Sequence, residues 1–179
     1  MLAKFGKFLR EIVPVFLVAL VIALLCKHFL VDNRVIPTAS MEPTVPTGGR
    51  MLVNQLAYRF GEPAFQDIVI FEPNDSTKEA VGRPDDMLKR VIGLPGDVVQ
   101  VTDAVLYING EAIDEPYLME PMYYEFGPVT VPEGHVFLLG DNRNNSYDSH
   151  LWEEPFVPIE NVEGRALLLY WPLDRFGSF

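Results

Sequence analysis

Cysteine is nearly absent from this chain, and so are several patterns that define common enzyme folds. Its 179 residues include a single cysteine, Cys26, so no disulfide can form within the chain. No C-x-x-C pair supplies the ligand spacing of a structural zinc site. No G-x-S-x-G occurs either, which excludes the nucleophile turn of an α/β-hydrolase.

Basic residues are scarce beyond residue 31. Residues 32–179 carry 10 Lys and Arg against 24 Asp and Glu, and a domain with that balance repels a phosphate backbone. We therefore expect no nucleic-acid partner. Residues 1–31 have the opposite balance, with four cations against the single acidic residue Glu11.

One long uncharged run is present, and it follows three of those cations. The run "IVPVFLVALVIALLC" covers Ile12–Cys26, and with the residues up to Val31 it reaches the length needed to cross a hydrocarbon core of about 30 Å. Cations before such a run predict a cytoplasmic N-terminus. We predict a cytoplasmic segment at 1–11, one transmembrane anchor at 12–31 in the lipid bilayer, and an extracytoplasmic domain at 32–179.

Two alternatives to a membrane anchor stay open. A cleaved signal peptide has a similar pattern, but cleavage after Ala39 would place Pro37 where a small residue is required. A helix buried in a protein core usually has one apolar face, whereas this run is apolar on all sides.

Beyond residue 31 no helical period is sustained, and short apolar runs alternate with turn signals. Asn109-Gly110 predicts a hairpin, and Leu94–Asp97 predicts a type II turn. We expect Glu72–Asp86 to be an exposed loop and Glu115–Pro128 to form a flap or a small sub-lobe. The prediction is an all-β domain with an antiparallel, barrel-like sheet and a small hairpin sub-lobe over 98–139. The predicted strands cover Asp67–Phe71, Met87–Leu94, Asp97–Val101, Ala104–Ile108, His135–Gly140 and Arg165–Trp171.

The stretch "VIPTASMEPTV" holds Ser40 between two prolines. Pro37 and Pro43 each fix φ at about −65°, and Pro43 disfavours a helical conformation at Glu42. We therefore expect Ser40 on rigid, extended backbone, which suits a nucleophile beside a substrate strand. The alternative is a turn hydroxyl without a chemical role.

The predicted strand "MLKRVIGL" contains two adjacent cations, Lys89 and Arg90. Since neighbouring residues of a strand point to opposite faces, one of the two must face an apolar interior. If it is Lys89, burial lowers its pKa from the usual ~10.4 and makes it a usable general base, a role closed to arginine. The alternative is an edge strand with both cations in solvent.

The stretch "GDNRNNSYDSH", Gly140–His150, directly follows an apolar strand. Its asparagines, aspartates and serines give it a dense supply of hydrogen-bonding side chains. Such a loop can hold a catalytic group in place. The alternative is a surface turn that caps only itself.

Together these stretches resemble the sequence boxes of one family. "PTASMEPT", "DIVIF", "KRVIGLPGD" and "GDNRNNSYDSH", in this order behind an apolar segment, resemble the bacterial type I signal peptidases, which are membrane-anchored serine proteases with a Ser–Lys dyad. The resemblance covers nearly the whole chain. It implies an antiparallel β fold, no metal or organic cofactor, and a location in the bacterial plasma membrane. The implied substrates are the signal peptides of exported preproteins, and the oligomeric state is left open.

The resemblance also implies roles for individual residues. Ser40 matches the nucleophile and Lys89 the general base. Thr38 matches the hydroxyl that completes the oxyanion hole together with the Ser40 N–H. Ser146 matches the hydroxyl that orients the lysine, and Asp148 matches a supporting acidic position.

Substrate contacts follow from the same resemblance. Met41 would line a pocket for a small side chain, and an extended peptide would lie near Ile36 and Met87. Substrates of the family carry small residues at −1 and −3, counted back from the cleaved bond. The chain departs from some relatives in having a short second lobe, and in having His150 where they carry an arginine.

Three alternative functions are compatible with the sequence. His150 with Asp148 or Asp141 could form a Ser–His–Asp set with Ser40 in place of the lysine. A membrane-tethered binding scaffold would need neither the serine nor Lys89. A specialised relative would mature one substrate, such as a pilin.

Overall fold

Apolar runs rich in β-branched residues, separated by proline and glycine turns, form the strands of the domain. The computed structural model describes residues 10–21, 31–82 and 86–179. Residues 10–21 are helical. The remaining elements are β1 (Val31–Val35), β2 (Arg50–Asn54), β3 (Ile68–Phe71), α2 (Asp75–Val81), β4 (Met87–Gly93), β5 (Val98–Thr102), β6 (Val105–Ile108), β7 (Glu111–Ala112), β8 (Phe126–Thr130), β9 (His135–Leu139), η1 (Arg143–Asn145), β10 (Phe156–Pro158), η2 (Ile159–Asn161), β11 (Val162–Trp171), η3 (Leu173–Arg175) and β12 (Gly177–Ser178).

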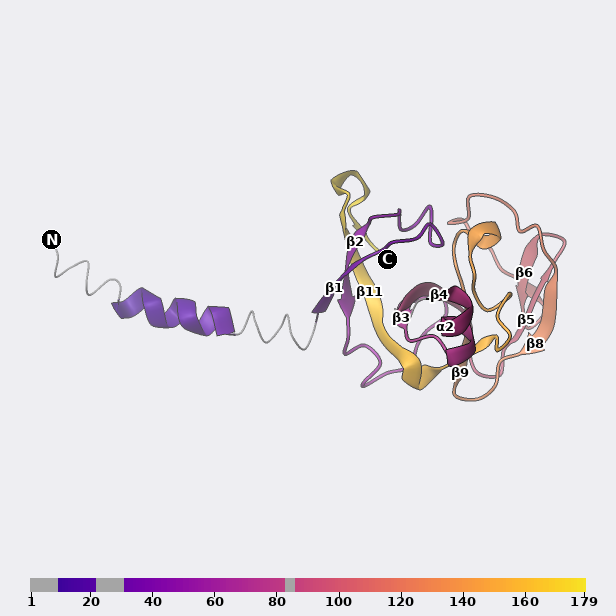
Figure 1. The fold of residues 1–179 in the computed structure, drawn as a ribbon, viewed down its shortest axis with the longest axis horizontal. Helices are drawn as coiled ribbons and strands as arrows, with labels where there is room; N and C mark the ends of the chain where they lie inside the picture. Colours follow the sequence, from indigo (N-terminus) through magenta and orange to yellow (C-terminus); the bar gives the residue numbers. More distant parts are fainter. Residues whose placement is uncertain (1–9, 22–30, 83–85) are drawn as a thin grey trace.

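The strands form two sheets, and every pairing is antiparallel. The larger sheet has the order β1-β2-β11-β3-β4-β9-β10, with β12 paired to β11. The smaller sheet has the order β7-β6-β5-β8. Figure 1 shows β5, β6 and β8 at one end of the domain, β1, β2 and β11 at the other, and β3, β4 and α2 between them.

Three clusters of buried apolar residues form the core of the domain. One of them joins the two sheets, because Ile92 and Phe137 of the larger sheet pack with Val99 and Leu106 of the smaller one. β3 and β4 lie centrally in the larger sheet, and all four residues of β3 are buried. Strand β4, which carries Lys89 and Arg90, is buried along most of its length.

The prediction of an antiparallel, mainly β-sheet fold is confirmed. The Asn109-Gly110 hairpin forms between β6 and β7, with φ of 55° and 81° at its two central residues. The Leu94–Asp97 turn has Gly96 at φ 84° and closes with a hydrogen bond from Asp97 N to Leu94 O. All six predicted strands form, with their ends shifted by one to three residues.

One prediction about local structure is wrong. The stretch Glu72–Asp86, predicted to be an exposed loop, contains the helix α2. Asn74 caps its start, since the Asn74 side chain accepts a hydrogen bond from the Thr77 N–H, and Gly82 ends it in the left-handed conformation. The asparagine before the helix and the glycine after it are start and stop signals that the polarity of the stretch concealed.

The hairpin sub-lobe expected over 98–139 is shorter than predicted. The smaller sheet ends with β8, and β9 joins the larger sheet beside β4. The reason is the apolar sequence of β9, "HVFLL", because a strand with four of its five residues buried belongs inside the domain.

The predicted membrane anchor at 12–31 extends over residues 22–30, which lie outside the described residues. Residues 10–21 are helical, whereas Val31 belongs to strand β1 and not to the end of the apolar helix. Among the residues that the structure describes, none forms a helix long and apolar enough to cross a membrane.

Candidate active site

Ser40 lies in the turn that connects β1 and β2, and the loop after β9 holds it there. The Asn142 N–H donates to Ser40 O at 3.0 Å, and Asn142 Nδ2 donates to Ala39 O at 3.1 Å. Two bonds from one asparagine thus fix the backbone on both sides of the Ala39–Ser40 peptide. The Ser40 side chain is nearly buried.

Lys89 reaches this serine from the centre of β4. Its Nζ lies 2.7 Å from Ser40 Oγ, and the residue is only 2% exposed. Burial lowers the pKa of Lys89 to about 8, although the negative charges of Asp148 and Asp141 oppose this shift. A large fraction of the amine is therefore uncharged at mildly alkaline pH, in contact with the hydroxyl.

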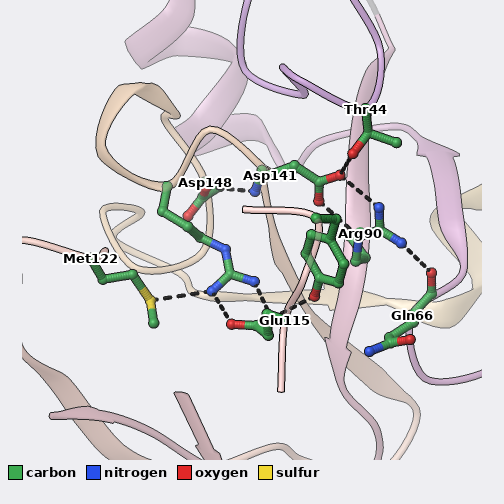
Figure 2. Close-up of polar contacts among 10 residues, drawn as sticks. Thr44, Gln66, Arg90, Glu115, Met122, Asp141 and Asp148 are labelled. Atoms are coloured by element: carbon green, nitrogen blue, oxygen red, sulfur yellow. Dashed lines mark hydrogen bonds and ion pairs between the residues drawn. The ribbon is translucent and has the colours of Figure 1, made fainter. Parts of the chain in front are cut away.

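Arg90 points to the other face of β4 and is buried as well, so both cations face the interior rather than one. The reason is that six of the seven residues of β4 are buried, so neither face of the strand is open to solvent. Asp141 compensates the charge, with Arg90 Nε 2.8 Å from its Oδ1 and Nη2 2.6 Å from its Oδ2. Figure 2 shows Arg90 between Asp141 and the carbonyl of Gln66, and the Tyr117 ring lies 4.0 Å from the guanidinium carbon.

The loop from Gly140 to His150 is held by buried carboxylates. Asp148 is fully buried, and its Oδ2 accepts a hydrogen bond from the Gly140 N–H at 2.8 Å. His150 Nδ1 lies 2.6 Å from Asp148 Oδ1, and the imidazole stacks on Tyr124 with 3.9 Å between ring centroids. His150 is thus held by this aspartate and by the Tyr124 ring.

His150 is not brought to the serine. Within the described residues, the hydrogen-bond partners of Ser40 Oγ are Lys89 Nζ and Thr38 Oγ1, the latter at 3.3 Å. The Ser–His–Asp alternative therefore has the His–Asp contact but lacks the contact with the nucleophile.

Thr38 and Ser146, which the resemblance implies to support the reaction, have different surroundings. Thr38 lies beside the Ser40 hydroxyl and is exposed, so its own hydroxyl is accessible to a bound substrate. Ser146 is buried next to Gly140, but its Oγ has no hydrogen-bond partner among the described residues. The expected bond from Ser146 to the lysine is therefore not formed in this structure.

A pocket of about 620 Å³ opens beside the Ser40–Lys89 pair. Ile36 and Met87, the residues expected to contact substrate, both line it. Met41 does not line it, because Met41 is fully buried in the cluster formed with Val45 and Met51. The structure thus places the Met41 side chain in the core beneath the Ser40 turn and not against this pocket.

Gly140 is a position that sequence patterns did not single out, and a side chain there should disrupt the site. A methyl group at this position would collide with Ser146 Oγ and with Ser40 O, and would lie 2.7 Å from Ser146 Cβ. We expect Gly140→Ala to lower the activity of the protein about 100-fold, because displacements near 1 Å misplace reacting groups. The measurement is kcat/KM for the protein's substrate, with Gly61→Ala as the control. The methyl group added at Gly61 would contact only Ala57 O, at 3.3 Å. Equal activity of both variants would contradict the tight fit at Gly140.

The chain is similar to known proteins of one family. The family model described as "Signal peptidase, peptidase S26" matches residues 9–171. A probable signal peptidase I-1 of Synechocystis is 41% identical over 173 residues, covering 96% of this chain and 87% of that protein. Signal peptidase I of Leptolyngbya laminosa is 41% identical over 161 residues, covering 89% and 78%. A solved signal peptidase I from Enterococcus faecalis is 35% identical, with a TM-score of 0.49, and covers 59% of this chain and 97% of that one.

The family model and the two relatives identify the class of this protein as a peptidase. The chain belongs to the signal peptidase family, peptidase S26.

Proposed function

We propose that this protein is a membrane-bound serine endopeptidase that removes signal peptides from exported preproteins, cutting after a small residue. Ser40 is the nucleophile and Lys89 the general base. The observation that carries the proposal is the contact of 2.7 Å between Lys89 Nζ and Ser40 Oγ beside an accessible pocket. Family membership supports the substrate class, since the curated relatives are named signal peptidases.

The first step forms an acyl-enzyme. The uncharged Lys89 amine takes the proton of Ser40, whose Oγ attacks the carbonyl carbon of the bond to be cleaved. The oxyanion that develops is stabilised by the Ser40 N–H and the nearby Thr38 hydroxyl. The C–N bond then breaks, and the Lys89 ammonium returns its proton to the leaving amine, the new N-terminus of the mature protein.

The second step releases the signal peptide. Lys89, again uncharged, takes a proton from a water molecule, and the resulting hydroxide attacks the ester carbonyl. The ester bond to Ser40 breaks, and Oγ regains a proton from Lys89. Both halves of the reaction therefore use the same amine as base and then as acid, so no second titratable group is required.

The membrane location belongs to the same proposal. The uncharged run Ile12–Cys26 behind three cations supports a single anchor with a cytoplasmic N-terminus. β1 begins at Val31, and Ser40 follows nine residues later. Such a short connection would keep the reactive serine near the outer membrane surface, where signal peptides emerge.

The test is cleavage of a purified preprotein by the detergent-solubilised full chain between pH 6 and 10. We expect one cut after the small residue that ends the signal peptide, identified by mass spectrometry of both products. Below pH 8, kcat/KM should rise about tenfold per pH unit and then level off near pH 8, because only deprotonated Lys89 accepts the serine proton. No cleavage at any pH would overturn the proposal.

The control for this test is His150→Gln, which removes the imidazole from Asp148 while leaving the Ser40–Lys89 contact in place. We expect this variant to keep most of its activity and the same pH profile. If it is inactive and the variants of Lys89 are not, the base is His150 and the assignment of the lysine is wrong.

A further inference from the structure

The helix α2 has one inward-facing stripe, and that stripe borders the active-site pocket. Thr77 and Val81 of α2 lie four residues apart and line the pocket that also contains Ser40 and Lys89, as does Pro73, which precedes the helix. Residues four apart lie on the same face of a helix. The outer face of α2, which includes Glu79, is exposed.

Thr77 is unusual among the residues of this stripe. It is only 2% exposed, and its Oγ1 has no hydrogen-bond partner among the described residues, although its N–H is bonded to the Asn74 side chain. A buried hydroxyl without a partner is costly for the fold and is normally avoided. A hydroxyl can donate and accept, so it can pair with either polar group of a peptide backbone.

The chain that leads to Ser40 also lines the pocket. Ile36 and Thr38 belong to that segment, while Ile70 and Leu88 come from the central strands. From Thr77 to Val81 the helical stripe covers about 6 Å, at ~1.5 Å per residue. An extended peptide advances ~3.3 Å per residue, so about two substrate residues fit alongside the stripe.

We propose that α2 is a specificity wall for the signal-peptide side of the substrate. The residues on the amino-terminal side of the −1 residue run along α2, Thr77 hydrogen-bonds the substrate backbone there, and Val81 limits the size of a side chain at −3 to −5. The −1 residue itself lies at Ser40, at the other end of this contact. This inference rests on the proposed function, because it takes the occupant of the pocket to be the substrate of Ser40.

The experiment compares the full-length wild type with three variants on a set of preproteins that carry single substitutions from −1 to −5. Thr77→Val keeps the shape of the side chain and removes the hydroxyl, Val81→Ala widens the pocket, and Glu79→Ala alters the outer face as the matched control. We expect Thr77→Val to lower kcat/KM three- to tenfold through KM, with no loss of thermal stability. Val81→Ala should improve cleavage of substrates with leucine at one position between −3 and −5 about tenfold relative to alanine. Neither variant should change the preference at −1, and Glu79→Ala should match the wild type.

A second measurement separates this inference from the proposed function. Binding of a synthetic signal peptide to the Ser40→Ala protein, with or without Thr77→Val, is followed by fluorescence anisotropy. If the wild type cleaves preproteins but the α2 variants keep wild-type selectivity and binding, the specificity wall is wrong and the protease assignment stands. If the wild type does not cleave but Thr77→Val still weakens peptide binding several-fold, the protease assignment fails and the contact with α2 stands. Absence of both cleavage and peptide binding overturns both.

Discussion

Replacing Lys89 by methionine should lower kcat/KM for a preprotein by about 1,000-fold or more. Methionine fills a similar volume but cannot accept a proton, and a positioned general base typically contributes factors of 10² to 10⁴. In the proposed mechanism Lys89 also serves in the second step, where it activates water. The measurement is cleavage of the preprotein at pH 8.5, where the wild-type amine is largely uncharged.

The same substitution should stabilise the fold at neutral pH. The pKa of Lys89 falls from 10.5 in the unfolded chain to about 8 in the folded protein, so the unfolded chain binds more protons between these values. Burying the protonated amine therefore costs roughly 3 kcal/mol below pH 8, at ~1.4 kcal/mol per pH unit. The cost fades as the pH rises toward 10.5. Lys89→Met should thus raise the free energy of unfolding most at pH 7 and least above pH 10, as measured by urea denaturation.

Ser40→Ala is the matched control for this pair of effects. It removes the nucleophile without changing a charge, so it should abolish cleavage and leave the pH dependence of stability unchanged. A Lys89→Met protein that is active would remove the lysine from the mechanism. One that is inactive and also less stable at pH 7 would indicate that the buried amine serves the fold rather than the chemistry.

The parts of the fold that the sequence predicted are those determined by local chemistry. Asn109-Gly110 and Gly96 specify their turns because few other residues adopt positive φ, and apolar runs such as β9 specify buried strands. β1 was missed, because its sequence "VDNRV" is polar and its pairing with β2 comes from tertiary context. The helix α2 was missed because its buried residue is a threonine, so its sequence shows no apolar stripe.

In the candidate site, too, features set by local sequence were predictable and features set by tertiary packing were not. Ser40 and Lys89 could be found because each combines a reactive side chain with an unusual neighbourhood in the sequence. Met41 was assigned to the pocket from its position next to the nucleophile, but the direction of a side chain in a turn is decided by the packing around it. Long-range contacts such as the one between Glu115 and Arg143 leave no local pattern at all.

The Glu115–Arg143 pair links the segment between β7 and β8 to the loop that follows β9. Arg143 lies in η1, between Gly140 and Ser146, and is 1% exposed. Its guanidinium makes two hydrogen bonds to Glu115, at 2.5 Å and 2.9 Å, and a third contact to Met122 Sδ at 3.2 Å. Figure 2 shows Glu115 and Met122 around this guanidinium, with Asp148 nearby. Within the described residues, the flap predicted at Glu115–Pro128 therefore supplies the only carboxylate that pairs with Arg143.

Glu115→Leu should lower the free energy of unfolding by about 3–5 kcal/mol, because it leaves the buried Arg143 charge without a partner. Chemical denaturation measures the loss, and Lys78→Ala is the control, since it breaks the more exposed Lys78–Glu72 pair, which water and salt screen, and should cost far less. The double variant Glu115→Leu/Arg143→Met should recover most of the loss, because removing both buried charges also removes their desolvation cost. If the single variant loses no more than Lys78→Ala does, or if the double variant recovers nothing, the pair is not what ties the flap to the catalytic loop.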